Sequence, residues 1–285
     1  MPQVDPQKLE FLLVEDTLWL ATQTVGVSVY DFAFETFFSC RHPLYRPNRI
    51  QAVGRFGVTE KYKELYTALL SEGVELIHSP SQYALASELT QWYPLLSDLT
   101  PRSHWFATPP TAQEIEKHFT WPIFVKGSRQ TSRHKAALSI LRTRAQYAAA
   151  IKEYRSNPIL HWQALVCREY IPLRKVPAPE SDTIPASFEF RTFWWRGTCV
   201  GAGPYWSAVA SYTWTQEEER QALAIAQEAA NRLALPFLVV DVAQTAEGKW
   251  IVIEVNDAQE SGYAGIPPLV LWQRVVELER TRLPS

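Results

Sequence analysis

The chain has 285 residues, of which 46% are hydrophobic and 20% charged, a composition typical of one large or two folded domains and not of a disordered chain. The formal net charge of -2 lacks the basic excess of a dedicated nucleic-acid-binding protein, so we expect no nucleic-acid partner. No apolar run approaches the about 18 residues that cross a bilayer, and the start, MPQVDPQKLEFLLVED, lacks the basic region of a signal peptide. Three cysteines without CxxC spacing favour a reducing compartment. We therefore expect a cytoplasmic protein with no membrane partner.

The N-terminal part predicts a βαβ unit. The first 50 residues are rich in aromatic side chains and show no clear period. Residues 50–54 predict a strand, residues 58–73 a helix that ends at Gly73, and residues 74–78 a second strand. Strand, helix and strand of these lengths imply a parallel pair joined by a right-handed crossover.

The middle of the chain predicts short helices and strands. Thr111 and Glu114 form a capping-box pattern that opens a helix. Strands are predicted over residues 123–126 and 164–171, with a helix over 145–154 between them. Residues 172–186 contain four prolines and predict a loop. A hairpin over residues 187–202 follows, with Arg196-Gly197 at its turn.

The C-terminal part predicts two helices and a pair of strands. Thr215 and Glu218 form a second capping box, and apolar residues at helical spacing predict a helix over 216–233. Strands are predicted over 237–242 and 249–255, and a last helix over 270–282. Antiparallel pieces after a βαβ unit favour an α+β protein with more than one lobe.

Positive charge collects in one segment. Between Lys126 and Lys152 there are seven Lys or Arg residues and no Asp or Glu. A charge run alone is most often a solvated face. Here, however, Lys126 ends a predicted strand, and the sequence GSRQTS follows it with small residues that expose backbone N–H groups. This combination would suit a polyphosphate, although the chain contains no Walker A motif.

Oxygen ligands collect near the ends of two predicted strands. Asp241 closes one apolar strand, while Glu254 and Asn256 are two residues apart on the next strand and so point to the same face. Mg²⁺ prefers hard oxygen ligands and keeps phosphate oxygens and water in its shell. The alternative is a set of strand-end side chains in solvent. The apolar run before each strand end favours a metal site.

Two aromatic pairs flank the predicted hairpin, Trp194-Trp195 and Tyr205-Trp206. They could line a pocket for an acceptor substrate or pack in the core, and core packing is the more common use of such residues. The six histidines lack the paired spacing of a zinc site.

Five segments, in this order and spacing, resemble the elements of an ATP-grasp domain. They are Phe124-Val125-Lys126, Arg168-Glu169-Tyr170-Ile171, Glu189-Phe190-Arg191, Val239-Val240-Asp241-Val242 and Trp250-Ile251-Val252-Ile253-Glu254-Val255-Asn256. The likeness covers roughly residues 85 to 265, and the βαβ start resembles the domain that usually precedes this fold. It implies an α+β ATP-grasp fold in which two lobes clamp ATP. An N-terminal α/β domain would span 1–84 and the ATP-grasp domain 85–285, with a small lobe over about 110–168 and a large lobe over about 169–285.

The resemblance also implies roles for individual residues. The nearest clade is named for one arginine and two lysines, here Arg191, Lys126 and Lys135. Lys126 would contact the α- and β-phosphates, and Lys135 would help to close the loop over them, together with Arg129 or Arg133. Arg191 would face the γ-phosphate. Further nucleotide contacts are expected from a hinge at Val166, Cys167, Arg168 and Glu169, and from Glu189. Asp241, Glu254 and Asn256 would hold Mg²⁺.

The activity that the resemblance implies is that of an ATP- and Mg²⁺-dependent ligase, which joins a carboxylate to an amine through an acyl-phosphate. The substrates would be ATP, an unidentified carboxylate donor and an amine acceptor, either small molecules or peptides. Two alternatives stay open: a kinase-like ATP-grasp phosphotransferase and a non-catalytic ATP-binding module. The sequence departs from the family pattern in three places. Residues 85–105 contain no lysine, the loop after Lys126 is poor in glycine, and Asp257-Ala258-Gln259 follows Asn256.

Overall fold

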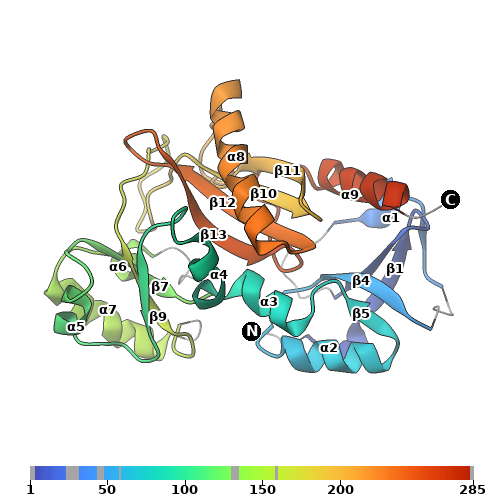
Figure 1. Ribbon diagram of the computed structural model, residues 1–285, viewed down its shortest axis with the longest axis horizontal. Helices are drawn as coiled ribbons and strands as arrows, with labels where there is room; N and C mark the ends of the chain where they lie inside the picture. Colours follow the sequence, from blue (N-terminus) through green and yellow to red (C-terminus); the bar gives the residue numbers. More distant parts are fainter. Residues whose placement is uncertain are drawn as a thin grey trace.

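The structure is a computed structural model that describes residues 4–23, 32–43, 48–57, 59–129, 135–157 and 160–282. The described residues form three β-sheets with helices packed around them (Figure 1). Their strand orders are β3-β1-β2-β4-β5, β6-β9-β7-β8 and β11-β10-β12-β13. This mixture of sheets and helices confirms the predicted α+β class. None of the described helices is both long enough and apolar enough to cross a membrane.

The first sheet contains the predicted βαβ unit. β4 (Ile50–Arg55) pairs in parallel with β5 (Val74–Leu76), and α2 (Tyr62–Ser71) connects them. The helix ends as predicted because Gly73 has φ +78°, and a Cβ there would lie 2.6 Å from the carbonyl oxygen of Asn48. The first part of the chain, for which the sequence predicted no element, adds short pieces to this sheet. They are a 3₁₀ helix (Pro6–Lys8), β1 (Glu10–Val14), β2 (Leu18–Thr22), α1 (Phe34–Phe37) and β3 (Cys40–Arg41).

The second sheet and its helices form the small lobe. β9 lies at the centre of the sheet, antiparallel to both β6 and β7. The lobe has its own apolar core, in which Val125, Leu141 and Cys167 pack against Tyr147 and Ile151. The predicted capping box is present, with Thr111 accepting from the Glu114 amide. The elements are β6 (Ser103–Phe106), α5 (Ala112–Glu116), β7 (Ile123–Gly127), α6 (Ala136–Ser139), β8 (Ile140–Leu141), α7 (Arg144–Ser156) and β9 (Leu165–Glu169).

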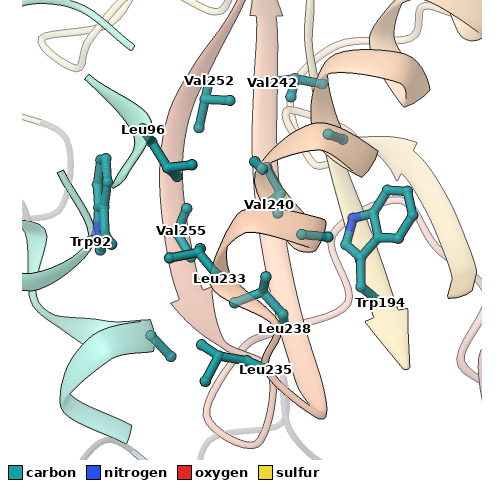
Figure 2. Packing of buried hydrophobic residues seen from close by; sticks show 14 of the residues in the cluster. Trp92, Leu96, Trp194, Leu233, Leu235, Leu238, Val240, Val242, Val252 and Val255 are labelled. Carbon is teal, nitrogen blue, oxygen red and sulfur yellow. The ribbon is translucent and has the colours of Figure 1, made fainter. Parts of the chain in front are cut away.

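The third sheet is antiparallel and forms the large lobe with two long helices. Its elements are β10 (Glu189–Trp195), β11 (Thr198–Pro204), α8 (Gln216–Leu233), β12 (Phe237–Gln244), β13 (Trp250–Asp257) and α9 (Pro268–Arg282). α8 covers one face of the sheet, together with α4 (Leu89–Leu96). Figure 2 shows Leu96 of α4 and Leu233 of α8 meeting Val240 and Val255 from the strands. This face is therefore closed and apolar, as the alternation of side chains along a strand requires.

The opposite face of the same sheet is divided along its length. Toward one end, Phe193 and Val239 pack with Trp272 of α9 and with residues of the first sheet. Further along the same strands, the side chains at alternate positions become charged: Arg191 follows Phe193 on β10, and Asp241 follows Val239 on β12. The charged half of this face lies toward the small lobe, and it is there that the candidate site is found.

The predicted boundary between residues 84 and 85 falls inside α3 (Pro80–Ser87), not in a linker. Ser79 caps α3 with a capping box to Gln82. α4 begins directly after α3, and Trp92 is buried in the core of the large lobe. The chain therefore passes from the first sheet to the large lobe through packed helices.

The segment of residues 257–262 follows β13 and is held by the end of β4. Arg55 is buried and donates to the carbonyl oxygens of Ala258 (2.8 Å), Gln259 (3.1 Å) and Ser261 (3.3 Å). The Gly54 amide donates to the side chain of Gln259 at 2.8 Å. These contacts fix the backbone just beyond the last residue of β13 against the N-terminal sheet.

A buried histidine makes a second connection at the same junction. His78 Nδ1 lies 2.9 Å from a carboxylate oxygen of Asp257, and the amide of Phe237 donates to His78 Nε2 at 3.2 Å. Because Nε2 accepts, the proton of the imidazole lies on Nδ1 and is donated to Asp257. The start of β12 and the end of β13 are thus joined through one side chain from outside the sheet.

Candidate active site

A cavity of about 150 Å³ lies between the small lobe and the charged half of the large sheet. Its walls come from both lobes and from the segment between β9 and β10. Phe124, Ile140, Ile171, Ile251 and Ile253 supply apolar walls. The ionisable side chains at the cavity are Lys126, Arg168, Glu169, Tyr170, Lys175, Glu189, Tyr205 and Glu254. A narrow apolar space with a few convergent charged groups is the usual form of a small-molecule site.

Three charged residues form a row across the large sheet. Arg191 on β10 is directly opposite Asp241 on β12, which is directly opposite Glu254 on β13, so the three side chains share one face. Arg191 donates to both carboxylate oxygens of Asp241, at 2.9 and 2.7 Å, and to the carbonyl oxygen of Gly262 at 3.0 Å. Asp241 is almost fully buried, with 1% of its side chain exposed. Its burial raises the pKa of the carboxyl group, and the Arg191 charge opposes that shift.

The row continues into the small lobe through an ion pair. Lys126, near the end of β7, contacts Glu254 of β13 through its ammonium group. Only 4% of the Lys126 side chain is exposed, against 23% for Glu254. The pair joins the two lobes at the wall of the cavity. The row therefore has a positive charge at each end, Lys126 and Arg191, and two adjacent carboxylates in the middle.

Glu189 is a buried carboxyl group at the cavity wall. Its Oε2 accepts from the Ser187 hydroxyl and from the Trp206 indole N–H, both at 3.1 Å. Burial, followed by the negative charge of Asp241, raises the pKa of Glu189 to about 8. At neutral pH the group is therefore largely protonated and can donate a hydrogen bond into the cavity.

Arg168 holds the point at which β13 bulges. The register between β12 and β13 shifts at this position, leaving Ile253 without a partner on β12. The guanidinium of Arg168 donates to the Ile253 carbonyl oxygen at 2.8 Å and to the Ser103 hydroxyl at 3.0 Å. Burial lowers the pKa of Arg168 to about 10, and the charge of Glu254 opposes that shift. Arg168 thus supports the strand beside Glu254 and ties it to the small lobe.

The predicted hinge needs a correction in position. Val166 and Cys167 lie inside β9, where the backbone is paired with β6 on one side and with β7 on the other. Both side chains are fully buried, so neither these side chains nor their paired backbone groups reach the cavity. The segment that lines the cavity begins at Arg168 and Glu169 and continues to Tyr170 and Ile171. The sequence placed the hinge too early because apolar strand residues and the exit from the strand form one continuous run.

Two predicted loop cations also lie elsewhere. The Lys135 ammonium contacts Glu153 of α7 at 2.8 Å, with half of the side chain exposed. Arg129 contacts Glu88 at 2.5 Å and lies over the ring of Tyr83, at the junction with α3. Neither residue lines the cavity, because each has a carboxylate partner outside it. Arg133, the alternative to these two residues, lies outside the described residues.

Arg191 and Asn256 differ from expectation in a smaller way. Arg191 was expected to face the γ-phosphate, but its guanidinium is committed to Asp241 and Gly262 behind the cavity wall. Asn256 lies on the same face as Glu254, one step further along and opposite Val239. Among the described residues, no three His, Cys, Asp or Glu side chains come together as a metal-binding group. The expected magnesium ligands are therefore two adjacent carboxylates and a nearby amide.

The structure also brings to the cavity residues that sequence reasoning left out or left open. Lys175 comes from the proline-rich segment, which carried no recognisable motif. Of the aromatic pairs, Trp194 and Trp195 are core residues, whereas Tyr205 and Trp206 line the cavity. Proximity to Glu189 through the hairpin was the available signal, since Tyr205 donates its amide to the Glu189 carbonyl at 2.9 Å.

Comparisons with known structures agree with this architecture. The chain is similar to the VanG D-Ala:D-Ser ligase from Enterococcus faecalis, with a TM-score of 0.58, 16% identity and coverage of 85% of this chain and 76% of that chain. It is similar to a D-alanine–D-alanine ligase from Bacillus anthracis complexed with ATP, with a TM-score of 0.55, 14% identity and coverage of 81% and 79%. A RimK domain ATP-grasp protein from Sphaerobacter thermophilus DSM 20745 gives a TM-score of 0.53, 14% identity and coverage of 80% and 77%.

These likenesses confirm the ATP-grasp fold that the sequence resemblance implied. A comparison with curated proteins gives no match. The model of an ATP-grasp domain family, the third of the clade named for one arginine and two lysines, matches residues 107–275, which is more than half of the chain. The chain therefore belongs to this clade of the ATP-grasp superfamily, whose members are mostly ATP-dependent carboxylate–amine ligases.

Proposed function

We propose that the cavity binds ATP with Mg²⁺ and that the protein joins a carboxylate to an amine through an acyl-phosphate. The observation that carries the proposal is the ion pair between Lys126 and Glu254. It places a buried cation and a carboxylate from opposite lobes at the wall of one cavity, with the carboxylate of Asp241 directly behind.

The shape of the cavity suits a nucleotide. Ile171, Ile251 and Ile253 give it apolar walls against which a flat base can pack. Tyr170 and Ile171 follow the end of β9, so their backbone groups lie beyond the paired part of the strand and are available to the edge of a base. Glu189, protonated at neutral pH, can hydrogen-bond to a sugar hydroxyl.

The carboxylates suit a divalent cation. Asp241 and Glu254 are direct cross-strand neighbours, and two like charges in this position repel unless positive charge lies near them. In the structure Arg191 and Lys126 supply that charge. Two hard carboxylates and an amide at Asn256 leave positions for phosphate oxygens and water, which matches the preference of Mg²⁺. When bound there, Mg²⁺ would neutralise charge on the phosphate oxygens.

The chain's own residues would then position and neutralise. Lys126, exchanging Glu254 for a phosphate oxygen, would stabilise negative charge as the carboxylate oxygen of the donor attacks the γ-phosphorus and the bond to ADP breaks. Arg191 would keep Asp241 ionised and in place. The amine acceptor would next attack the acyl carbon, lose a proton and release phosphate. Because water would destroy the acyl-phosphate, the buried position of the site between two lobes supports this chemistry.

The test begins with calorimetry of ATP binding with and without Mg²⁺. Mg²⁺ should strengthen binding, and Lys126→Ala should weaken it. The protein is then incubated with MgATP and pools of amino acids, polyamines and peptides, while ADP and phosphate release and mass changes are recorded. ADP with a new amide supports the ligase. ADP with a phosphomonoester would support a kinase-like enzyme instead, and binding without turnover over the whole screen would support a non-catalytic module.

A further inference from the structure

The proline-rich segment of residues 172–187, here named the strap, has a defined path across the molecule. Its first part adds to the large lobe: the Arg174 amide donates to the Gln244 carbonyl at 2.9 Å, and the Phe188 amide donates to the Arg174 carbonyl at 2.7 Å. Val176 and Ala186 are joined by a hydrogen bond of 3.2 Å, so the strap folds back on itself like a loose hairpin. The predicted loop therefore has ladder-like backbone contacts at its base.

The far end of the strap reaches the small lobe. The Ala136 amide at the start of α6 donates to the Asp182 carbonyl at 2.9 Å, and Lys135 forms a β-bridge with Thr183. The strap thus connects the large lobe to the region that follows β7. Between these two attachments, Ile184, Pro185 and Ala186 line the cavity. The strap is consequently one wall of the nucleotide cavity and not an outlying loop.

Lys175 is the charged side chain that the strap gives to this wall. Neighbouring residues in extended backbone point to opposite sides, and Arg174 points outward to Glu218 at the start of α8, at 2.5 Å. Lys175, in contrast, is a residue of the cavity wall, and its backbone forms a β-bridge with Ser187, which itself contacts Glu189. The strap therefore separates two adjacent cations, one committed to the protein surface and one placed at the cavity.

The other cations around the cavity already have partners within the protein. Lys126 is paired with Glu254, Arg191 with Asp241, and Arg168 with a hydroxyl and the Ile253 carbonyl. Within the part of the chain that the structure describes, no carboxylate forms an ion pair with Lys175. Its ammonium is exposed in the ligand-free protein and costs no existing ion pair when it turns to an anion.

We propose that Lys175 is a nucleotide-binding residue and that its ammonium binds a phosphate oxygen of the nucleotide in the cavity. This inference rests on the proposed function, because it requires a polyphosphate there. The strap supplies the cation that is free to respond to the ligand, whereas Lys126 must first leave Glu254. Arg168 and Arg191 remain supports of the two strands that carry the carboxylates.

The experiment combines binding and chemical modification. Dissociation constants for ATP, ADP and adenosine are measured with Mg²⁺ for the wild type, Lys175→Gln, Lys175→Arg and the charge-matched control Lys63→Gln, which removes an exposed cation from α2. Lys175→Gln should weaken ATP and ADP binding by about fivefold to tenfold and leave adenosine unchanged. Lys175→Arg should restore the affinity, and Lys63→Gln should have no effect. Because Lys175 is exposed, its substitution by Gln leaves the core intact.

Amine acetylation, mapped by mass spectrometry, gives an independent readout. Saturating MgATP should slow acetylation of Lys175 and leave Lys63 unchanged. Equal loss of adenosine and ATP affinity in Lys175→Gln, or an unprotected Lys175 in a protein that binds MgATP, would overturn the assignment while the proposed function stands. Absence of MgATP binding by the wild type, with no lysine protected, would overturn the proposed function and this assignment together.

Discussion

Replacing Glu189 by glutamine should change how the stability of the protein depends on pH. The carboxyl group is buried at the cavity wall, and its Oε2 accepts from Ser187 and Trp206. A glutamine can place its oxygen in the same position and keep both hydrogen bonds, but it carries no charge at any pH. The variant is therefore a mimic of the protonated form that the raised pKa of about 8 implies at neutral pH.

The direction follows from the two pKa values. In the unfolded chain the group ionises near its ordinary value of 4.5, whereas in the folded protein it keeps its proton to about 8. The stability that comes from the higher folded pKa is fully present below 4.5 and is lost as the pH rises to about 8. Each pKa unit corresponds to about 1.4 kcal/mol, so the loss over this range is of the order of a few kcal/mol. The glutamine variant lacks this loss.

Denaturant unfolding between about pH 5 and pH 9 measures the difference directly. Relative to the wild type, Glu189→Gln should gain stability steadily as the pH rises. Glu260→Gln is a matched control, since burial also raises the pKa of Glu260 to about 8, but at the junction with Tyr83 and away from the cavity. Both variants should flatten the pH dependence, and only Glu189→Gln should alter ATP affinity. A constant difference between Glu189→Gln and the wild type across the pH range would refute the raised pKa.

Three further substitutions test the charged row. Lys126→Ala should weaken ATP binding by about tenfold or more, because a buried point charge facing the phosphates is removed; unchanged affinity in calorimetry of a folded variant would contradict this role. Glu254→Gln should leave the fold intact and reduce the gain in ATP affinity that Mg²⁺ gives by about tenfold or more, as followed by titration with Mg²⁺; the same Mg²⁺ effect as in the wild type would place the metal elsewhere. Arg191→Lys keeps the charge but loses the two-point contact with Asp241, so single-turnover ADP formation should fall by about 100-fold with little change in ATP affinity; wild-type turnover would make Arg191 a purely structural residue.

The sequence predicted those elements best whose ends carry a local signal. α8 spans Gln216–Leu233, the range that was expected, because the capping box at Thr215 and Glu218 and an apolar stripe mark it without reference to the rest of the fold. The βαβ unit was predicted for the same reason, since Gly73 ends its helix. The β1–β2 hairpin was missed because its turn at Glu15 and Asp16 uses positive φ without glycine, so no turn signal stood in the sequence.

The candidate site divides in the same way. Lys126, Glu254 and Asp241 could be predicted because each follows an apolar strand whose register fixes the side to which its side chain points. Lys135 could not be placed, because its direction depends on a partner, Glu153, that approaches through the tertiary fold. Lys175 lay in a proline-rich segment without periodicity, and only the return of that segment across both lobes brings it to the cavity.

The hold of Arg55 on residues 258–261 is a hold on the main chain alone. A carbonyl oxygen is present at every position whatever the side chain, so the guanidinium recognises spacing along the backbone and not residue identity. One residue inserted or deleted there would move all three acceptors at once. In relatives that retain this junction, the distance in sequence from the end of β13 to Tyr263 is therefore more tightly constrained than the letters between them. The same holds for evolution in the laboratory: libraries that vary the letters of this segment retain the junction, and libraries that vary its length lose it.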